Sequence, residues 1–172
     1  MRAKMVLKVF MTLVISSFGV NGLLLNENYV CPDGWTVFAD HCYFYNIFRK
    51  PWMDAQTTCE NLGGHLATIA DGDEDNFIGN FITQSRTLAS DWSHNYTWVG
   101  ATDQLKEGIW LWVTGTPLNM TLYSNWRGPG ANNAHHGSHT EDCMDWSYGG
   151  WNDNDCASAL NFVCEKALCA NL

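Results

Sequence analysis

Basic residues are scarce in this sequence, which has 9 lysines and arginines against 18 aspartates and glutamates and a formal net charge of -9. A surface with this excess of negative charge repels polyanions, so nucleic acid is not expected as a partner. Long apolar runs are also missing. No apolar run reaches the roughly 18 to 20 residues that a membrane-spanning helix needs. No internal repeat or low-complexity block is visible. The composition therefore predicts one acidic globular domain with no membrane insertion.

The first 22 residues have the pattern of a secretory signal peptide. Residues 1–4 form a basic start, residues 9–15 are apolar, and small residues surround Gly19 and Gly22. We place cleavage after Gly22, which removes 3 of the 9 basic residues and no acid, so the mature charge becomes -12. Residues 23–30 then form an N-terminal linker. The protein is expected to be secreted into an extracellular, oxidising environment.

The sequence contains 7 cysteines. In a secreted chain such residues pair as disulfides, and zinc–thiolate sites are not expected. Because the number is odd, one cysteine is left over, and pairing the others allows about 105 arrangements that spacing alone cannot resolve. The cysteines stand at positions 31, 42, 59, 143, 156, 164 and 169.

Hydrophobic periodicity predicts an α+β domain with two helices. The first helix covers residues 51–62, and the second covers roughly residues 74–84. A hairpin is expected between residues 31–35 and 37–45, with a disulfide from Cys31 to Cys42 as one way to staple it. Further strands are predicted at residues 65–69, 96–101, 109–113, 143–146 and 161–164.

The acidic run at residues 71–76 is similar to the start of an EF-hand calcium loop. Asn76 and Ile82 stand where such a loop requires glycine and glutamate, so this interpretation fails. The run is better explained as a helix start, at which Asp71 or Asp73 accepts hydrogen bonds from free backbone amides.

The strongest functional signal lies near the end of the chain. Residues 114–140 are rich in glycine, proline, asparagine and histidine, and so long a loop inside a compact domain is usually functional. The following segment, residues 140–156, contains oxygen donors of the kind that Ca²⁺ prefers. These donors are Glu141, Asp142, Asn152 and Asp153.

Taken together, these patterns resemble the C-type lectin-like domain over residues 31–166. Among its subfamilies the chain looks most like the short secreted lectins of invertebrates, the perlucin-like proteins. The resemblance implies a disulfide-stapled α+β fold in which two helices flank two small antiparallel sheets and a long loop binds calcium and ligand. The stretches that carry it are residues 52–69 with Cys59, 98–101, 124–126, 141–143, and 151–153 with Cys156 and Cys164.

The resemblance also implies which cysteines pair. The implied pairs are Cys31 with Cys42, Cys59 with Cys164, and Cys143 with Cys156. Cys169, in the C-terminal tail at residues 167–172, then remains unpaired. This cysteine predicts a disulfide-linked homodimer, and the alternative is a capped or free thiol.

The resemblance implies that the cofactor is Ca²⁺ and that the partner is a glycan. In such a site an asparagine oxygen binds the metal while its amide group donates to a sugar hydroxyl, and carboxylates accept from hydroxyls. The principal site, for both calcium and carbohydrate, falls on Asn132, Glu141, Asn152 and Asp153. An auxiliary calcium site falls on Asp103, Glu107 and Asp142, with help from Asn133.

The sequence departs from the family at the start of the principal site. Gly130 and Ala131 fill the positions where the family has an acid or amide followed by a cis-proline. The missing ligand is expected to weaken calcium affinity, and the usual rule for sugar specificity cannot be applied.

A calcium-dependent lectin, serving innate immune recognition of glycans, is therefore the first functional hypothesis. The alternative is a calcium-independent module on the same fold that binds protein or mineral, in which residues 151–153 only shape a turn. A hydrolase using the loop histidines with Glu141 is not supported, because no nucleophile stands beside a base. These histidines, His135, His136 and His139, are most simply solvated loop residues, although they could also bind zinc.

Two further positions predict modification of the secreted chain. Asn95 and Asn119 each stand two residues before a threonine, which is the acceptor pattern for N-linked glycosylation.

Overall fold

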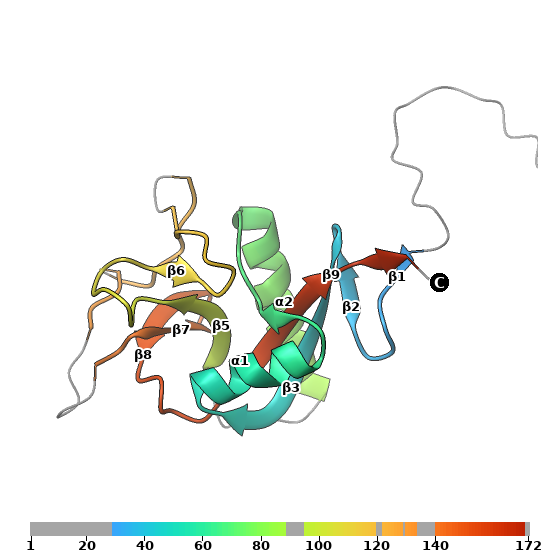
Figure 1. Cartoon of the computed structure of the whole chain (residues 1–172), viewed down its shortest axis with the longest axis horizontal. Coiled ribbons are helices and arrows are strands. Elements are labelled where there is room, and N and C mark those ends of the chain that lie inside the picture. The colour runs from blue at the N-terminus through green and yellow to red at the C-terminus, as the bar shows by residue number, and fades with distance from the viewer. Residues whose placement is uncertain (1–28, 89–94, 120–121, 129, 134–139, 171–172) are drawn as a thin grey trace, which may run out of the picture.

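The computed structural model describes residues 29–88, 95–119, 122–128, 130–133 and 140–170 (Figure 1). The predicted signal peptide, most of the linker and the loop histidines His135, His136 and His139 lie outside these residues. The helices within them are α1 (Trp52–Asn61) and α2 (Gly72–Leu88). The strands are β1 (Tyr29–Val30), β2 (Thr36–Phe38), β3 (His41–Lys50), β4 (His65–Leu66), β5 (Thr97–Thr102), β6 (Leu111–Trp112), β7 (Cys143–Ser147), β8 (Gly150–Asn154), β9 (Leu160–Ala167) and β10 (Cys169–Ala170).

Most strands join a single sheet of 8 strands, in the order β2-β3-β9-β5-β7-β8 with β4 on β9 and β6 on β5. The sheet is mixed, because β5 runs parallel to β9 while its other neighbours are antiparallel. The remaining strands, β1 and β10, form a separate two-stranded sheet. The α+β fold is as expected, but the two sheets are unequal in size and one contains a parallel pair.

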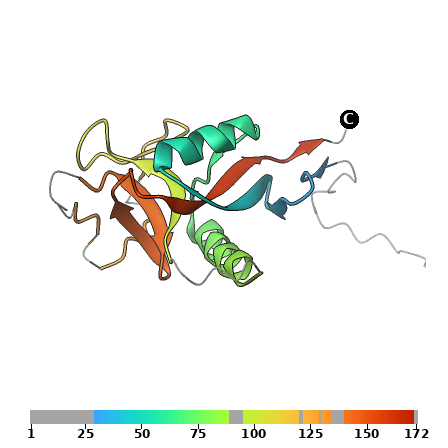
Figure 2. The ribbon, with the colours of Figure 1, turned by 90° about the horizontal axis from the view of Figure 1, so that it is seen from below.

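The two helices lie on opposite sides of the β3–β9 pair (Figure 2). On one side, α1 buries Trp52, Ala55 and Cys59 against a cluster that includes Trp98 and Phe162. On the other side, α2 contributes to a second apolar cluster that includes Met144 and Trp151. Neither helix of the described chain is long and apolar enough to cross a membrane.

The start of α2 follows the capping prediction and excludes an EF-hand geometry. The Oδ1 atom of Asp71 accepts the backbone N–H groups of Asp73 and Glu74, both at 3.0 Å. These amides have no partner inside the helix, so the side chain of Asp71 satisfies them. The helix continues to Leu88, beyond the predicted end at residue 84.

The predicted hairpin at residues 31–45 is formed by different residues. Residues 32–35 make a turn, in which the Trp35 N–H donates to the Pro32 carbonyl at 3.0 Å, and the hairpin is formed by β2 and β3. The reversal between these strands includes Ala39, whose φ of 49° is unusual for a residue with a side chain. No glycine or asparagine marks this turn in the sequence, which explains why the prediction misplaced it.

The three predicted disulfides are present, joining Cys31 to Cys42, Cys59 to Cys164 and Cys143 to Cys156. The second bond ties α1 to β9 across a sequence separation of 105 residues. Cys169 is the free cysteine, and it is exposed.

Candidate functional site

The hairpin of β7 and β8 positions the two residues with the strongest metal-binding signature in the sequence. Asn152 pairs across this hairpin with Asp145, and Asp153 pairs with Met144. Because side chains alternate along a strand, Asn152 and Asp153 point to opposite faces. Asn152 is half-buried, whereas Asp153 is 1% exposed. A single ion can reach both residues only if Asp153 offers a main-chain oxygen or if the ion lies at the strand end.

The carbonyl oxygen of Asp153 is suitably placed for this role. The Asn152 amide group lies against that oxygen and also donates to Asp145 Oδ2 at 3.1 Å. The Asn152 side chain and the Asp153 carbonyl are therefore side by side. The Asp153 carboxylate accepts the Asn133 N–H through Oδ2, and its Oδ1 is buried with no hydrogen-bond partner in the described residues.

Asn133 connects the long loop to this hairpin. Its N–H bonds to Asp153, its side-chain oxygen accepts the Glu141 N–H at 3.0 Å, and its amide group donates to Glu107 at 2.6 Å. The neighbouring Asn132 is exposed, and Glu141 is half-buried. The structure thus brings the residues predicted for the principal site into one region at the end of the loop.

The predicted auxiliary site is centred on a buried acid. Burial raises the pKa of Asp103 to about 6; the Gly108 N–H, which donates to it at 2.8 Å, lowers this pKa, and the charges of Glu107 and Asp142 raise it. The Asp103 N–H donates to the Asp142 carbonyl at 3.2 Å, which fixes the two acids as neighbours. In the described part of the chain, Asp103 Oδ1 is buried without a partner. A divalent cation would stabilise such an arrangement of like charges.

Among the described residues, no three side chains of histidine, cysteine, aspartate or glutamate converge to hold a metal ion. A calcium site in this region must therefore include amide or main-chain oxygens, which Ca²⁺ accepts as well as carboxylates. The same holds for Asp103, Glu107 and Asp142, which share a neighbourhood but do not form a three-acid cluster. Asn133, already bonded to Glu107, is the amide best placed to complete that site.

Asp145 belongs to the same region, although no motif in the sequence points to it. Its exposure is 0%, and burial raises its pKa to about 6 against the lowering effects of Asn154, Ser147 and Asn152. Its Oδ2 accepts the side-chain amides of Asn152, at 3.1 Å, and Asn154, at 3.0 Å. Asp145 thereby orients the Asn152 side chain. The role of Asp145 can be recognised only when β7 is known to pair with β8, and β8 was not predicted as a strand.

Asp75 in α2 supports the hairpin from the opposite side. Its carboxylate is 3% exposed and accepts four hydrogen bonds. The donors are Trp146 Nε1 at 3.0 Å, Trp151 Nε1 at 2.9 Å, the Tyr123 hydroxyl at 2.9 Å and the Asn125 amide. Since Trp151 directly precedes the candidate calcium ligand on β8, this network fixes the strand that carries the site.

Comparison with protein families assigns this fold to a known family. A profile described as the Lectin C-type domain matches residues 48–166, well over half of the chain. The chain belongs to the C-type lectin domain family. Members of this family are generally carbohydrate-binding proteins without enzymatic activity.

The proteins similar to this C-type lectin domain include a recognition domain solved in the presence of a sugar and a calcium-independent protein. C-type lectin domain family 4 member M of Nomascus concolor is 36% identical over 136 residues, which are 79% of this chain and 31% of that protein. The carbohydrate-recognition domain of cow CD23, solved in the presence of a GlcNAc2Man3 oligosaccharide, has a TM-score of 0.67 and 32% identity, with 83% of this chain and 99% of that chain covered. A calcium-independent type II antifreeze protein has the same TM-score of 0.67 and 26% identity, with 84% and 99% covered. The chain thus spans about a third of the length of its curated relative, and the fold alone does not decide calcium dependence.

The departure at Gly130 and Ala131 has a structural counterpart in this C-type lectin domain. Gly130 has a φ of 104°, a conformation that residues with side chains rarely adopt. An acid or amide at this position would be strained unless the loop changed its path. No peptide bond of the described residues is cis, including those around Ala131. The loop therefore reaches Asn132 by a route that suits glycine.

The two predicted glycosylation sites differ in environment. Asn95 is half-buried, and its side-chain oxygen accepts a hydrogen bond from Arg86 at 2.7 Å. Asn119 is exposed. Glycosylation of both remains a prediction, and Asn119 is the more accessible acceptor.

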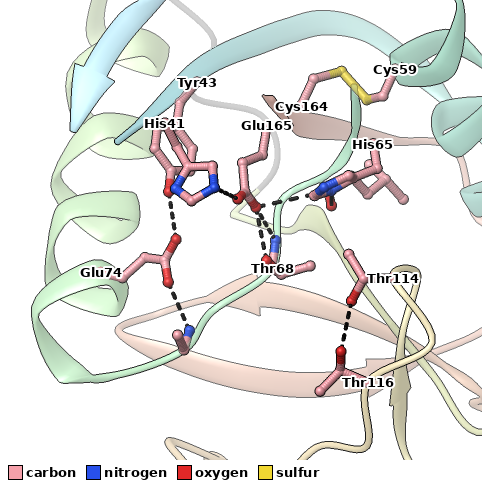
Figure 3. Close-up of polar contacts among 12 residues, drawn as sticks. His41, Tyr43, Cys59, His65, Thr68, Glu74, Thr114, Thr116, Cys164 and Glu165 are labelled. Atoms are coloured by element: carbon pink, nitrogen blue, oxygen red, sulfur yellow. Dashed lines mark hydrogen bonds and ion pairs between the residues drawn. A yellow bond between two sulfur atoms is a disulfide. The ribbon is translucent and has the colours of Figure 1, made fainter. Parts of the chain in front are cut away.

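A further polar pocket, of about 470 Å³, is lined by residues of β3, α2 and β9 (Figure 3). Glu165, which is 2% exposed, accepts the Thr68 N–H at 2.7 Å and the Thr68 hydroxyl at 2.9 Å. Its other carboxylate oxygen lies 3.5 Å from His41 Nε2. These bonds connect the residue after Cys164 to the segment that follows β4.

Glu74 forms the second half of this pocket. It accepts the Ala70 N–H at 2.7 Å and the hydroxyl of Tyr43. Burial raises the pKa values of both Tyr43 and Glu74, and the bond to Glu74 raises that of Tyr43 further. Each carboxylate oxygen of Glu74 and Glu165 has a protein partner, so this pocket serves as a polar connection between α2 and the sheet.

Proposed function

We propose that this chain is a secreted, calcium-dependent carbohydrate-binding protein. The single observation that carries the proposal is the presence of buried carboxylate oxygens without partners in the described residues, on Asp153 and Asp103. A buried carboxylate oxygen without a partner costs free energy, and a cation bound to that oxygen removes the cost. Carboxylate oxygens are ligands that Ca²⁺ prefers.

Within this proposal each residue of the principal site has a defined part. Asn152 and Asp153 would bind calcium at the end of β8, Asp153 through its unpartnered carboxylate oxygen or its carbonyl, and Asn132 and Glu141 would complete the set from the loop. A bound calcium ion would act as a Lewis acid that coordinates the hydroxyl oxygens of a sugar. The asparagine amides would donate hydrogen bonds to those hydroxyls, and the Glu141 carboxylate would accept hydrogen bonds from them. Asp103, Glu107, Asp142 and Asn133 hold a second ion that stabilises the loop.

Replacing Asn152 with alanine is expected to abolish calcium-dependent glycan binding. The change removes a metal ligand and a hydroxyl donor together, so affinity should fall by about 100-fold or more. A glycan array with calcium and with EDTA measures this directly. The wild-type protein should also gain roughly 3 kcal/mol of unfolding free energy when calcium reaches about 100 times its Kd.

Asn154→Ala is the matched control, because Asn154 lies on the same strand and also donates to Asp145 but is not a proposed ligand. This variant should retain most of the glycan binding. Glycan binding by the wild-type protein that is equally strong with calcium and with EDTA, or equal losses in the two folded variants, would contradict the principal site.

A second candidate function is a calcium-independent module that binds protein or mineral. It is favoured by Gly130 and Ala131, which supply no ligand, and by the likeness to a calcium-independent antifreeze protein. Under this alternative the Asn152→Ala variant binds its partner as the wild-type protein does. Residues 151–153 lie inside β8, so they do not form the turn that this alternative assumed.

The finer features of the proposal rest on the sequence patterns. We place the chain among the perlucin-like invertebrate lectins and propose a part in innate immune recognition. We also propose that residues 1–22 are a signal peptide and that Asn95 and Asn119 are glycosylated. The matched relatives include mammalian proteins of greater length. The mass of the protein collected from culture medium tests secretion and removal of the signal peptide. A loss of mass after glycosidase treatment tests glycosylation.

We also expect a disulfide-linked homodimer through Cys169, which is exposed and lies in β10. Non-reducing gels of the secreted protein should show twice the reduced mass, and Cys169→Ser should remove that band. Two linked sites would raise apparent affinity through effective concentration. Identical migration with and without reductant would exclude the dimer.

A further inference from the structure

A small polar pocket lies between α2 and the turn that joins β7 to β8. Its volume is about 190 Å³. Pockets for drug-sized molecules are typically about 300 to 1,000 Å³, so this one suits a single ring of a small polar ligand. None of the residues proposed for calcium binding lines it.

The lining presents amide and hydroxyl groups beside an indole ring. Asn76 and Asn80 are exposed and stand one helical turn apart on α2, and their side chains have no hydrogen-bond partner within the described residues. Thr83 donates its hydroxyl hydrogen to the Gly79 carbonyl at 2.8 Å, which leaves its oxygen free to accept. Half-buried Trp146 supplies apolar surface. Donors, acceptors and an aromatic surface together match the mixed polar and apolar faces of a pyranose ring.

The pocket is preorganised, and its lining includes the carboxylate of Asp75, whose oxygens are occupied by hydrogen bonds. Trp146 and Asn125 are held by Asp75, each of whose oxygens already accepts two hydrogen bonds. A side chain at Gly79 would place its first carbon 2.4 Å from the Trp146 ring, so glycine is needed for the ring to lie here. No lysine, arginine or histidine of the described residues lines the pocket. A neutral ligand therefore fits better than an anionic one.

We propose that this pocket is a second carbohydrate subsite, which binds one neutral pyranose, a hexose or an N-acetylhexosamine, without calcium. Asn76 and Asn80 bind its hydroxyl or acetamido groups, and Trp146 packs against its apolar face. With so few contacts, affinity for one sugar is on the order of millimolar or weaker. The subsite is independent of the calcium site and stands even if that site binds no glycan.

The test is a titration with methyl glycosides of mannose, galactose, glucose and N-acetylglucosamine in EDTA, followed by the indole N–H signal of Trp146 in NMR spectra. At least one glycoside should shift this signal. The Asn76→Ala/Asn80→Ala variant should reduce that affinity by about tenfold or more through the loss of two hydrogen bonds. Alanine is a good helix former at these exposed positions, so the fold is retained.

Gln84→Ala is the matched control, because Gln84 is an exposed amide on α2 outside the pocket. It should leave the titration unchanged, and Asn152→Ala should do so as well. No shift with any glycoside in EDTA, or the same affinity in the double variant and the wild type, would overturn the proposal. Failure of the calcium site instead appears as loss of calcium-dependent binding with the EDTA titration intact.

Discussion

Replacing Asp75 with alanine is expected to cost more than about 4 kcal/mol of unfolding free energy. The change removes one carboxylate but leaves the indole N–H groups of Trp146 and Trp151, the Tyr123 hydroxyl and the Asn125 amide without their acceptor. Hydrogen bonds to charged groups contribute about 1.5 to 3 kcal/mol each, and buried donors left unpaired add to the loss. Because the four bonds share one acceptor, their losses do not simply add.

Urea denaturation followed by tryptophan fluorescence measures this loss. Asp73→Ala is the matched control, since Asp73 is an exposed acid in the same helical turn, and it should cost less than about 1 kcal/mol. Asp75→Asn should fall between the two, because one acceptor oxygen remains while the new amide faces donors. A loss below about 1.5 kcal/mol for Asp75→Ala would show that the tryptophans find other partners.

Removing the bond between Cys59 and Cys164 is the second change with a large expected effect. The bond closes a sequence separation of 105 residues, for which the chain-entropy model gives an upper figure of about 4 to 5 kcal/mol. It also connects α1 to β9, in the cluster that contains Trp98 and Phe162. The Cys59→Ala/Cys164→Ala variant should therefore unfold at much lower urea concentration.

The bond between Cys143 and Cys156 provides the comparison. It spans 13 residues, so its removal should cost about 3 kcal/mol on the same model. It brackets β7 and β8, and its loss should weaken calcium binding more than loss of the longer bond does. The chain-entropy account fails if removal of the shorter bond is the more destabilising change.

The helices followed from local signals in the sequence. The first helix was predictable because Trp52, Ala55 and Cys59 recur at helical spacing. The second was predictable because Asp71 stands where its side chain can accept the free backbone N–H groups of a helix start. The cysteine pairs followed only from the family resemblance. The hairpin of β2 and β3 was misplaced, because Ala39 adopts a positive φ that its side chain does not predict.

The site was predictable only in part. Asn152 and Asp153 stand out as adjacent oxygen donors, but their arrangement depends on β8, whose short sequence is rich in asparagine, aspartate and glycine and therefore does not favour a strand. Its strand geometry comes from pairing with β7. The contribution of Asp145 and Asp75 comes from burial, which brings together residues distant in sequence and cannot be read from spacing.

The small sheet of β1 and β10 brings both ends of the described chain to one end of the molecule, and the hairpin of β7 and β8 lies at the opposite end (Figure 1). A label, a surface or a further domain attached at either end of the described chain would consequently lie at the end of the molecule opposite the candidate glycan site. Immobilisation through a terminal tag should leave that site facing the solution. Molecules coupled in this way to a flat support would all present it outward, toward a glycan-coated particle approaching from solution.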